Sequence, residues 1–220
     1  MTKANKILLL SDHETEAQDQ GFRFIFGIDE AGRGPLAGPV VAAAVCLTSS
    51  SFSCPINDSK KMTPVLRERA FHEIFEKAHV GIGMISEAVI DVVNILNASH
   101  LAMEAAVADL VSRLPSEVSG AEDFKKQVML LVDGNRFKSA LPYRYKTIIG
   151  GDGRCLSIAC ASVIAKVTRD RAMRCYDRVF PQYGFGQHKG YPTSMHREVL
   201  RRCGPSLIHR RSFNIGGLKP

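Results

Sequence analysis

The sequence lacks any hydrophobic run long enough to cross a membrane. Its longest apolar stretch, residues 40–47, falls far short of the roughly 18 residues that a membrane span needs. Residues 7–10 are too few for the apolar core of a signal peptide. No internal repeat recurs along the chain, which excludes solenoids and propellers. We therefore expect a soluble, cytoplasmic protein with no membrane association.

Metal-binding and disulfide patterns of cysteine are also missing. The 6 cysteines include no CxxC pair, so the sequence indicates neither a zinc site nor a disulfide framework. The histidines at 188, 196 and 209 have no metal-ligand spacing, and we expect them to serve as capping or surface residues.

Charge is distributed unevenly along the chain. Residues 1–110 hold 9 Lys and Arg against 14 Asp and Glu, whereas residues 111–220 hold 20 against 8. A basic half of this density suits a polyanionic partner, and nucleic acid is the leading candidate. A solvated basic helix face is the alternative. Aromatic residues around His188 and Lys189, namely Tyr183, Phe185 and Tyr191, favour nucleic acid.

Hydrophobic periodicity predicts an α/β fold. The first 20 residues are polar and are expected to form a loose tail, so residues 21–220 make up a single domain. Within it, the patterns predict five strands and three long helices, which together imply a mixed five-stranded sheet flanked by helices and followed by a C-terminal helical segment. The expected strands are 22–28, 40–47, 80–85, 128–132 and 145–149, and the helices are 64–78, 86–114 and 156–180.

Four acidic residues follow strands of this predicted sheet. Asp29 and Glu30 come after the first strand, Asp133 after the fourth and Asp152 after the fifth. Any one of them could be a turn or capping residue. As a group they would repel one another unless cations neutralised them, and oxygen ligands favour Mg²⁺ or Mn²⁺. On a basic protein this combination suggests phosphodiester chemistry, in which two cations clamp the attacking water and the leaving oxygen.

A glycine-rich loop lies between the first two strands. Residues 32–38 read GRGPLAG, which lacks the GK[ST] ending of a P-loop and is not followed by a helical pattern. A tight turn between strands and a substrate-contacting loop are both compatible with this pattern.

These segments together resemble ribonuclease HII, the type 2 ribonucleases H. Residues 27–41 read GIDEAGRGPLAGPVV, which is similar to the signature of that family. Further segments agree in the same order: 57–61 (NDSKK), 94–98 (NILNA), 131–135 (LVDGN), 161–171 (ASVIAKVTRDR) and 188–193 (HKGYPT). The resemblance extends from Phe22 to about Phe213.

The resemblance implies an RNase H-like fold and a metal-dependent endonuclease. Such an enzyme cuts the RNA strand of RNA–DNA hybrids and single ribonucleotides embedded in duplex DNA, leaving 3′-OH and 5′-phosphate ends. It assigns the four carboxylates as ligands of Mg²⁺ or Mn²⁺. The backbone of Gly32, Arg33 and Gly34 would read the 2′-hydroxyl. Tyr191 would stack beneath the sugar at the junction of ribose and deoxyribose.

Other polar residues have weaker assignments. Ser59, Lys60, Lys61, Lys166 and Lys189 are candidate phosphate contacts, although a solvated surface role fits each lysine equally well. Asp170 competes with Asp152 as the fourth ligand, but a mid-helix position with Arg174 one turn on indicates an ordinary ion pair.

Two other functions remain to be distinguished. One is another nuclease or strand-transferase of the same fold, against which the glycine-arginine-glycine loop and Tyr191 argue. The other is a hybrid-binding protein without catalysis, which would need no acidic cluster. We expect an enzyme that acts as a monomer on nucleic acid.

Overall fold

Strand β1 (Phe24–Ala31) is the central strand of the sheet. The computed structural model describes residues 11–214, and its strands follow the order β3-β2-β1-β4-β5. β1 pairs antiparallel with β2 (Val40–Leu47), which pairs antiparallel with β3 (Ala78–Ile85). On its other side β1 runs parallel to β4 (Val128–Asp133), and β4 runs parallel to β5 (Arg144–Ile148). The carboxyl ends of β1, β4 and β5 therefore meet at one edge.

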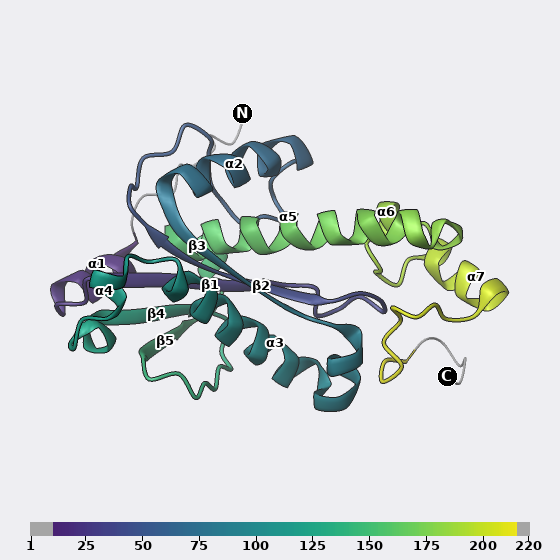
Figure 1. Cartoon of the computed structure of the whole chain (residues 1–220). Coiled ribbons are helices and arrows are strands. Elements are labelled where there is room, and N and C mark those ends of the chain that lie inside the picture. The colour runs from purple at the N-terminus through teal and green to yellow at the C-terminus, as the bar shows by residue number, and fades with distance from the viewer. Residues whose placement is uncertain (1–10, 215–220) are drawn as a thin grey trace.

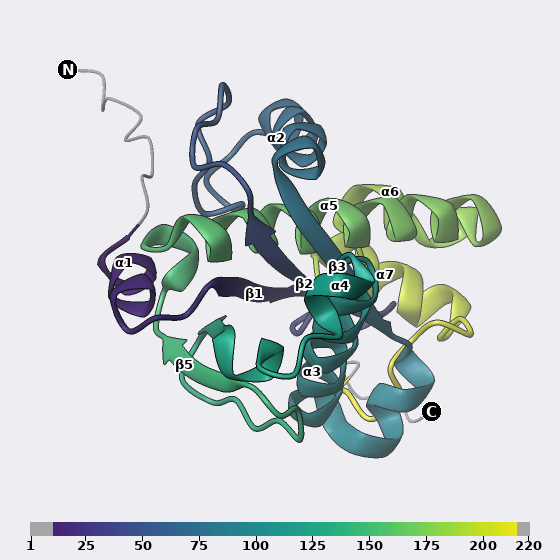
Figure 2. The ribbon, with the colours of Figure 1, turned by 60° about the vertical axis from the view of Figure 1, so that its left-hand side comes forward.

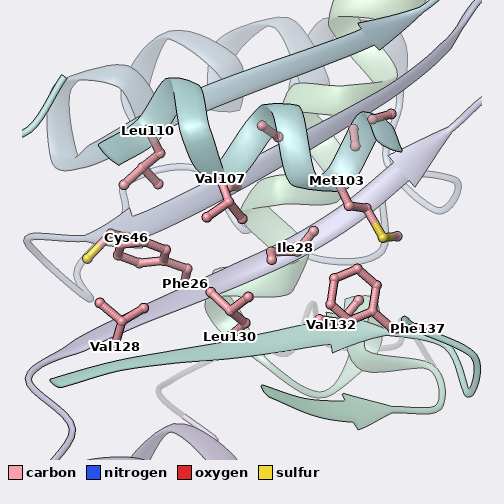
Figure 3. Packing of buried hydrophobic residues seen from close by; sticks show 14 of the residues in the cluster. Phe26, Ile28, Cys46, Met103, Val107, Leu110, Val128, Leu130, Val132 and Phe137 are labelled. Carbon is pink, nitrogen blue, oxygen red and sulfur yellow. The ribbon is translucent and has the colours of Figure 1, made fainter. Parts of the chain in front are cut away.

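Helices cover both faces of this sheet (Figure 1). Helix α3 (Glu87–Ser112) lies on one face, where alternate residues of β1 and β4 meet it in a closed hydrophobic core. Figure 3 shows Phe26 and Ile28 of β1 between Val107 of α3 and Leu130 of β4. The opposite face packs against α5 (Leu156–Val179) and α2 (Pro64–Lys77). Sheet and helices thus form three layers.

Close packing of α5 on β1 depends on Gly27. A Cβ atom at this position would lie 2.2 Å from the backbone carbon of Ser157, well inside contact distance. Only glycine lets the start of α5 approach the strand this closely. The side chain two residues further along β1 is Asp29, so this contact also brings α5 close to the first of the candidate carboxylates.

Local capping signals set the ends of two helices. The hydroxyl of Thr63 accepts a hydrogen bond from the backbone N–H of Leu66 at the start of α2, with Pro64 in the first turn. Helix α3 is interrupted at Asn94, whose φ is 69°. Its side-chain oxygen accepts hydrogen bonds from the N–H groups of Leu96 and Asn97, so it caps the second part of the helix.

The C-terminal region returns to the sheet end that carries the first carboxylates. After α5 come η3 (Pro181–Tyr183), α6 (Phe185–His188) and α7 (Ser194–Cys203). The segment that follows α7 runs back toward the loop between β1 and β2, as Figure 1 shows in yellow. An isolated bridge joins Ala37 of that loop to His209. The C-terminal helical segment predicted from the sequence is confirmed.

The prediction of a loose N-terminal tail is wrong for the described part of that segment. Residues Asp12–Asp19 form helix α1, which lies against the start of α5 (Figure 2). Ser11 and Glu14 make a reciprocal capping box. The Glu14 carboxylate is buried and accepts hydrogen bonds from the N–H groups of Leu156 and Ser157. Residues 1–10 lie outside the described residues.

The predicted sheet and long helices are confirmed, with shifted boundaries. β1 begins and ends later than predicted, so Asp29 and Glu30 lie within the strand rather than beyond it. The predicted third strand, 80–85, begins at Ala78. The structure adds three short helical turns between the main elements: α4 (Ser116–Ser119), η1 (Phe124–Gln127) and η2 (Gly151–Gly153). Across the described residues, none of the helices has the length and apolar character needed to span a membrane.

Candidate active site

Three of the candidate carboxylates lie at the edge where the parallel strands end. The pairing of β1 with β4 ends at Ile28 and Val132, so Asp29 and Asp133 each follow directly after a paired residue. Asp152 belongs to η2, which connects β5 to α5. The Asp133 Oδ1 atom accepts a hydrogen bond of 2.7 Å from the N–H of Gly151, which ties the end of β4 to η2.

Glu30 follows Asp29 on β1 and lines both a cleft and a smaller pocket. A cleft of about 490 Å³ contains Glu30, the 32–34 loop, Ser59, Lys60, Lys166 and Tyr191 in its wall. A smaller pocket of about 80 Å³, under α3, is lined by Glu30 and Asp133. The Glu30 Oε1 atom is 3.3 Å from Nη1 of Arg33.

Burial and mutual repulsion make Asp29, Glu30 and Asp133 difficult to ionise. Burial raises the pKa of Asp29 well above its usual value, and the charges of Glu30 and Asp133 raise it further. Burial also raises the pKa of Glu30, against the lowering effect of Arg33. The pKa of Asp133 is raised by burial, and the charge of Asp152 adds to this, against the N–H of Gly151. Their carboxylates are therefore close enough to interact electrostatically.

Lysine 60 supplies a counter-charge to the same group. Its Nζ atom is 3.4 Å from Oδ2 of Asp152. Partial burial lowers the pKa of Lys60, but the carboxylates of Asp152, Asp29 and Asp58 outweigh this and raise it. The lysine thus stabilises negative charge where the sequence predicts a cation site.

The ligand atoms that the four candidate residues offer are of the type that hard divalent cations prefer. All four candidate ligands offer carboxylate oxygens, with no thiol or imidazole among them, and uncompensated negative charge is what a cation would neutralise. Within residues 11–214, however, no group of three or more His, Cys, Asp or Glu side chains is arranged so that it could hold a metal ion. Lys60 and Arg33 are the charged partners of this acidic group as it stands.

The glycine-arginine-glycine loop and Tyr191 lie next to each other in the lining of the cleft. A Cβ atom on Gly34 would lie 3.8 Å from Cε1 of Tyr191, so the two residues are neighbours with little between them. The Leu36 N–H donates to the carbonyl of Gly190, which joins the loop to the segment that carries Tyr191. Tyr191 is 41% exposed and lines the cleft, so it is accessible to a ligand there.

Three histidines hold the segment around Tyr191 by bonding to backbone groups, as a capping role predicts, whereas the prediction of a surface role for them is wrong. His188, His196 and His209 are all buried, and the first two rings stack with centroids 4.1 Å apart. Since the carbonyl of Tyr191 can only accept, Nδ1 of His196 donates to it, and Nε2 of His196 then accepts from Nε2 of His209. Nδ1 of His209 accepts from the N–H of Ser206. This series of hydrogen bonds requires the imidazole rings of His196 and His209 to be neutral.

The remaining candidate contacts have different surroundings. The Ser59 hydroxyl is buried and hydrogen-bonded to that of Ser162, and Lys166 pairs with Asp170 at 2.7 Å while lining the cleft. Lys61 pairs with Asp58. Lys189 directs its ammonium group to the carbonyl of Gly186.

Asp170 is an ion-pair residue with a different partner from the one expected. Its oxygen bonds to Lys166, four residues before it, whereas Arg174 pairs with Glu68 of α2. The prediction of an ordinary helical ion pair is therefore right in kind and wrong in partner.

Comparison with known proteins identifies the family. A family model described as ribonuclease HII matches residues 26–215. The chain belongs to the ribonuclease HII family. A protein named ribonuclease HII from Syntrophus aciditrophicus is 48% identical over 211 residues, covering 95% of this chain and 93% of the relative. Another, from Acetivibrio thermocellus, is 45% identical over 210 residues, covering 95% of this chain and 77% of the relative. This membership identifies the chain as a ribonuclease H, a hydrolase and endonuclease.

Solved structures agree with this fold. The ribonuclease H2 from Pyrococcus horikoshii OT3 has a TM-score of 0.63 at 24% identity, covering 87% of this chain and 94% of that one. The Bst-RNase HIII structure in complex with Mn²⁺ has a TM-score of 0.67 at 16% identity, covering 90% and 70%. At these identities the likeness supports the RNase H-like architecture alone.

Sequence reasoning missed two residues next to the candidate site. Arg169 and Arg210 are fully buried behind the loop 32–39 and hydrogen-bond its carbonyl groups. No local pattern distinguishes a buried arginine from a surface one in a basic region, so only the fold reveals them.

Proposed function

We propose that this ribonuclease H cleaves the RNA strand of RNA–DNA hybrids and single ribonucleotides embedded in duplex DNA, leaving 3′-OH and 5′-phosphate ends. The observation that carries this proposal is the cleft in which Glu30, the glycine-arginine-glycine loop and Tyr191 share one wall. Glu30, one of the four proposed cation ligands, thus lines the same cleft as the groups proposed to recognise the ribose.

The proposed cation ligands are Asp29, Glu30, Asp133 and Asp152, and the proposed cations are Mg²⁺ or Mn²⁺. A divalent cation bound there would stabilise the charge that develops on the phosphodiester during in-line displacement. Two backbone hydrogen bonds orient two of these carboxylates. The N–H of Glu30 donates to the carboxylate of Asp29, and the N–H of Gly151 donates to that of Asp133.

Recognition of the ribonucleotide would combine backbone donors with an aromatic ring. The 2′-hydroxyl distinguishes RNA from DNA, and backbone groups of Gly32, Arg33 and Gly34 lie in the cleft where they could read it. Next to this loop, Tyr191 offers its exposed ring to the sugar. Reading a sugar in this way requires no contact with the base, so cleavage would be independent of sequence.

Phosphate contacts would come mainly from two lysines of the cleft wall, Lys60 and Lys166. Ser59 lies beside them, with its hydroxyl held by Ser162. Lys61 and Lys189 remain proposed contacts at the margin, since their ammonium groups are engaged by Asp58 and by the carbonyl of Gly186. We also propose that the enzyme works as a cytoplasmic monomer in the replication and repair of DNA.

The variant Asp133→Asn tests this function. Its amide oxygen can still accept the Gly151 hydrogen bond, but the ligand charge is lost. We expect cleavage of a labelled RNA–DNA hybrid to fall by at least about 1,000-fold, as expected for a loss of several kcal/mol of charge stabilisation, while the Kd for the hybrid changes less than about twofold. Asp123→Asn, at an exposed ion pair with Lys126, is the control.

Two outcomes would contradict the proposal. Cleavage by Asp133→Asn at the wild-type rate would remove Asp133 from the site. Tight hybrid binding by the wild-type protein without any cleavage in Mg²⁺ or Mn²⁺ would favour the non-catalytic binding protein instead.

A further inference from the structure

Arginine 210 lies beneath the glycine-arginine-glycine loop and bonds to four of its carbonyl groups. Its side chain is fully buried. The guanidinium donates to the carbonyl oxygens of Gly32 at 2.6 Å and Pro35 at 2.8 Å, and to those of Gly38 at 2.9 Å and Arg33 at 3.1 Å. One side chain from the C-terminal segment therefore fixes four peptide planes in the connection between β1 and β2.

Arginine 169 of α5 holds the other half of the same connection. It is 1% exposed and donates to the carbonyl oxygens of Ala37, Pro39 and Lys189 at 2.9 to 3.0 Å. Its guanidinium carbon lies 5.9 Å from the ring centroid of Tyr191. A Cβ atom on Gly32, where φ is 105°, would lie 2.2 Å from Nε of Arg169, so this glycine makes room for the arginine.

These guanidinium groups are charged although they are buried. Burial lowers the pKa of Arg169 to about 10 and that of Arg210 to about 9, which leaves both protonated at neutral pH. A buried charge is costly unless hydrogen bonds compensate it. Seven backbone carbonyl groups provide this compensation, since within residues 11–214 the two guanidinium groups donate their hydrogen bonds to carbonyl oxygens. Such a planar fork of donors is specific to arginine, because a lysine ammonium is a single point.

The direction of the carbonyl groups determines the direction of the amides that follow them. The described residues contain no cis peptide bond, and in a trans peptide the C=O and the next N–H point in opposite directions. With the carbonyls of Gly32 and Arg33 turned toward Arg210, the N–H groups of Arg33 and Gly34 are turned away from it. No hydrogen bond within residues 11–214 engages either of these two N–H groups.

We infer that Arg210 and Arg169 are positioning residues that hold the loop 32–39 with the Arg33 and Gly34 N–H groups presented to the ribose hydroxyl of the substrate. This inference rests on the proposed function and deepens it, since it names what gives the loop its specificity. The arginines touch no substrate themselves. They act by fixing two backbone donors before the substrate arrives. Binding then carries no further entropic cost for ordering the loop.

The first experiment observes the two donors directly in the full chain. Asp133→Asn protein is labelled with ¹⁵N, and its amide spectrum is recorded with a DNA duplex that contains one ribonucleotide and with the same duplex in all-DNA form. We expect the Arg33 and Gly34 signals to shift further downfield with the ribonucleotide duplex than with the all-DNA duplex. Identical spectra of these two amides in both complexes would overturn the inference.

The second experiment distinguishes the hydrogen-bonding geometry of the Arg210 side chain from its charge. In the Asp133→Asn background, Arg210→Lys keeps the charge and Arg210→Met removes it, while Arg211→Met at the exposed neighbouring position is the control. For each protein the Kd of the ribonucleotide duplex is compared with that of the all-DNA duplex. We expect the ratio of the all-DNA Kd to the ribonucleotide-duplex Kd to fall at least about tenfold in both Arg210 variants. The Kd for the all-DNA duplex should change less than about twofold. Full preference in Arg210→Lys would overturn the positioning role.

Failure of this inference differs from failure of the proposed function. If the wild-type protein cleaves the ribonucleotide duplex but the Arg33 and Gly34 amides do not respond to the ribose, the function stands and the positioning role is wrong. If the wild-type protein does not cleave that duplex at all, the proposed function itself is wrong. The spectra need no substitution at the buried arginines, so they remain decisive even where an Arg210 variant fails to fold.

Discussion

Lys60 and Asp152 are 92 residues apart in the chain, yet Nζ of the lysine lies 3.4 Å from Oδ2 of the aspartate. The lysine comes from the connection between β2 and α2, and the aspartate from the turn before α5. This contact joins a lysine of the cleft wall to the turn that carries Asp152. It also gives Lys60 a place from which it can contact a phosphate next to the proposed cation site.

Removing Lys60 should weaken nucleic-acid binding in a salt-dependent way. If its ammonium contacts a phosphate, Lys60→Ala should make the slope of log K against log salt shallower by about one. Fluorescence anisotropy of a labelled hybrid at several KCl concentrations measures this slope. Lys126→Ala, at an exposed lysine paired with Asp123, is the matched control and should leave the slope unchanged. Equal slopes in all three proteins would refute the phosphate contact.

Tyr191 should act through its ring rather than through its hydroxyl. We expect Tyr191→Ala to reduce kcat/KM for a single-ribonucleotide duplex by roughly tenfold or more, in line with about 1 to 3 kcal/mol for an aromatic stacking contact. Tyr191→Phe keeps the ring and should retain most of the activity. Steady-state kinetics of both variants distinguish the two cases, and equal losses in Tyr191→Phe and Tyr191→Ala would assign the role to the hydroxyl.

Helix α1 should contribute to stability through one buried carboxylate. Glu14 accepts hydrogen bonds from the N–H groups at the start of α5, where a negative charge also interacts well with the helix dipole. We expect Glu14→Ala to lower the free energy of unfolding by about 2 to 4 kcal/mol, since charge-assisted hydrogen bonds are lost and buried donors are left unpaired. Urea denaturation measures this change.

Glu16 on the same helix is the control for that measurement. It forms an exposed ion pair with Lys146, so Glu16→Ala should cost less than about 1 kcal/mol. Equal effects of the two substitutions would show that α1 does not depend on the contact of Glu14 with α5.

The buried histidines should make stability depend on pH below neutrality. Burial lowers the pKa of His196 and His209 from 6.5 to about 4, so the folded protein keeps neutral rings where the unfolded chain takes up protons. Their contribution to stability is present above about pH 6.5 and is lost as the pH falls toward 4, at up to about 1.4 kcal/mol per pH unit for each proton. Unfolding by urea between pH 4 and 7.5 measures this slope.

Two variants identify the groups responsible. His209→Gln should flatten the slope, whereas His72→Gln at an exposed position on α2 should leave it as in the wild-type protein. An unchanged slope in His209→Gln would exclude this histidine as the source.

Much of the fold was accessible from the sequence because its signals are local. Alternation in β1 and the apolar run of β2 predicted strands, and Thr63 with Pro64 predicted the start of α2. The capping box of Ser11 and Glu14 is an equally local signal, and reading the acidic residues of this segment only as solvated polar groups led to the wrong prediction of a tail.

The sequence predicted the candidate site from two sources, the acidic residues at the ends of strands and the resemblance to a known family. The order of the carboxylates at strand ends indicated their common edge, and the resemblance to ribonuclease HII supplied the loop and Tyr191. Long-range contacts were not predictable. The burial of His196 against His209, and the carbonyl groups that surround Arg210, depend on a segment that returns to the sheet from α7. Nothing in the neighbouring residues encodes that return.

The most direct measurement is cleavage of a DNA duplex with one ribonucleotide, beside an identical all-DNA duplex, in Mg²⁺, in Mn²⁺ and in chelator. We predict a single cut on the 5′ side of a phosphate next to the ribose, with 3′-OH and 5′-phosphate ends, in either cation but not in chelator. The all-DNA duplex should stay intact in all three conditions. Cutting of the all-DNA duplex at a similar rate, or cutting of the ribonucleotide duplex that persists in chelator, would contradict a cation-dependent site that reads ribose.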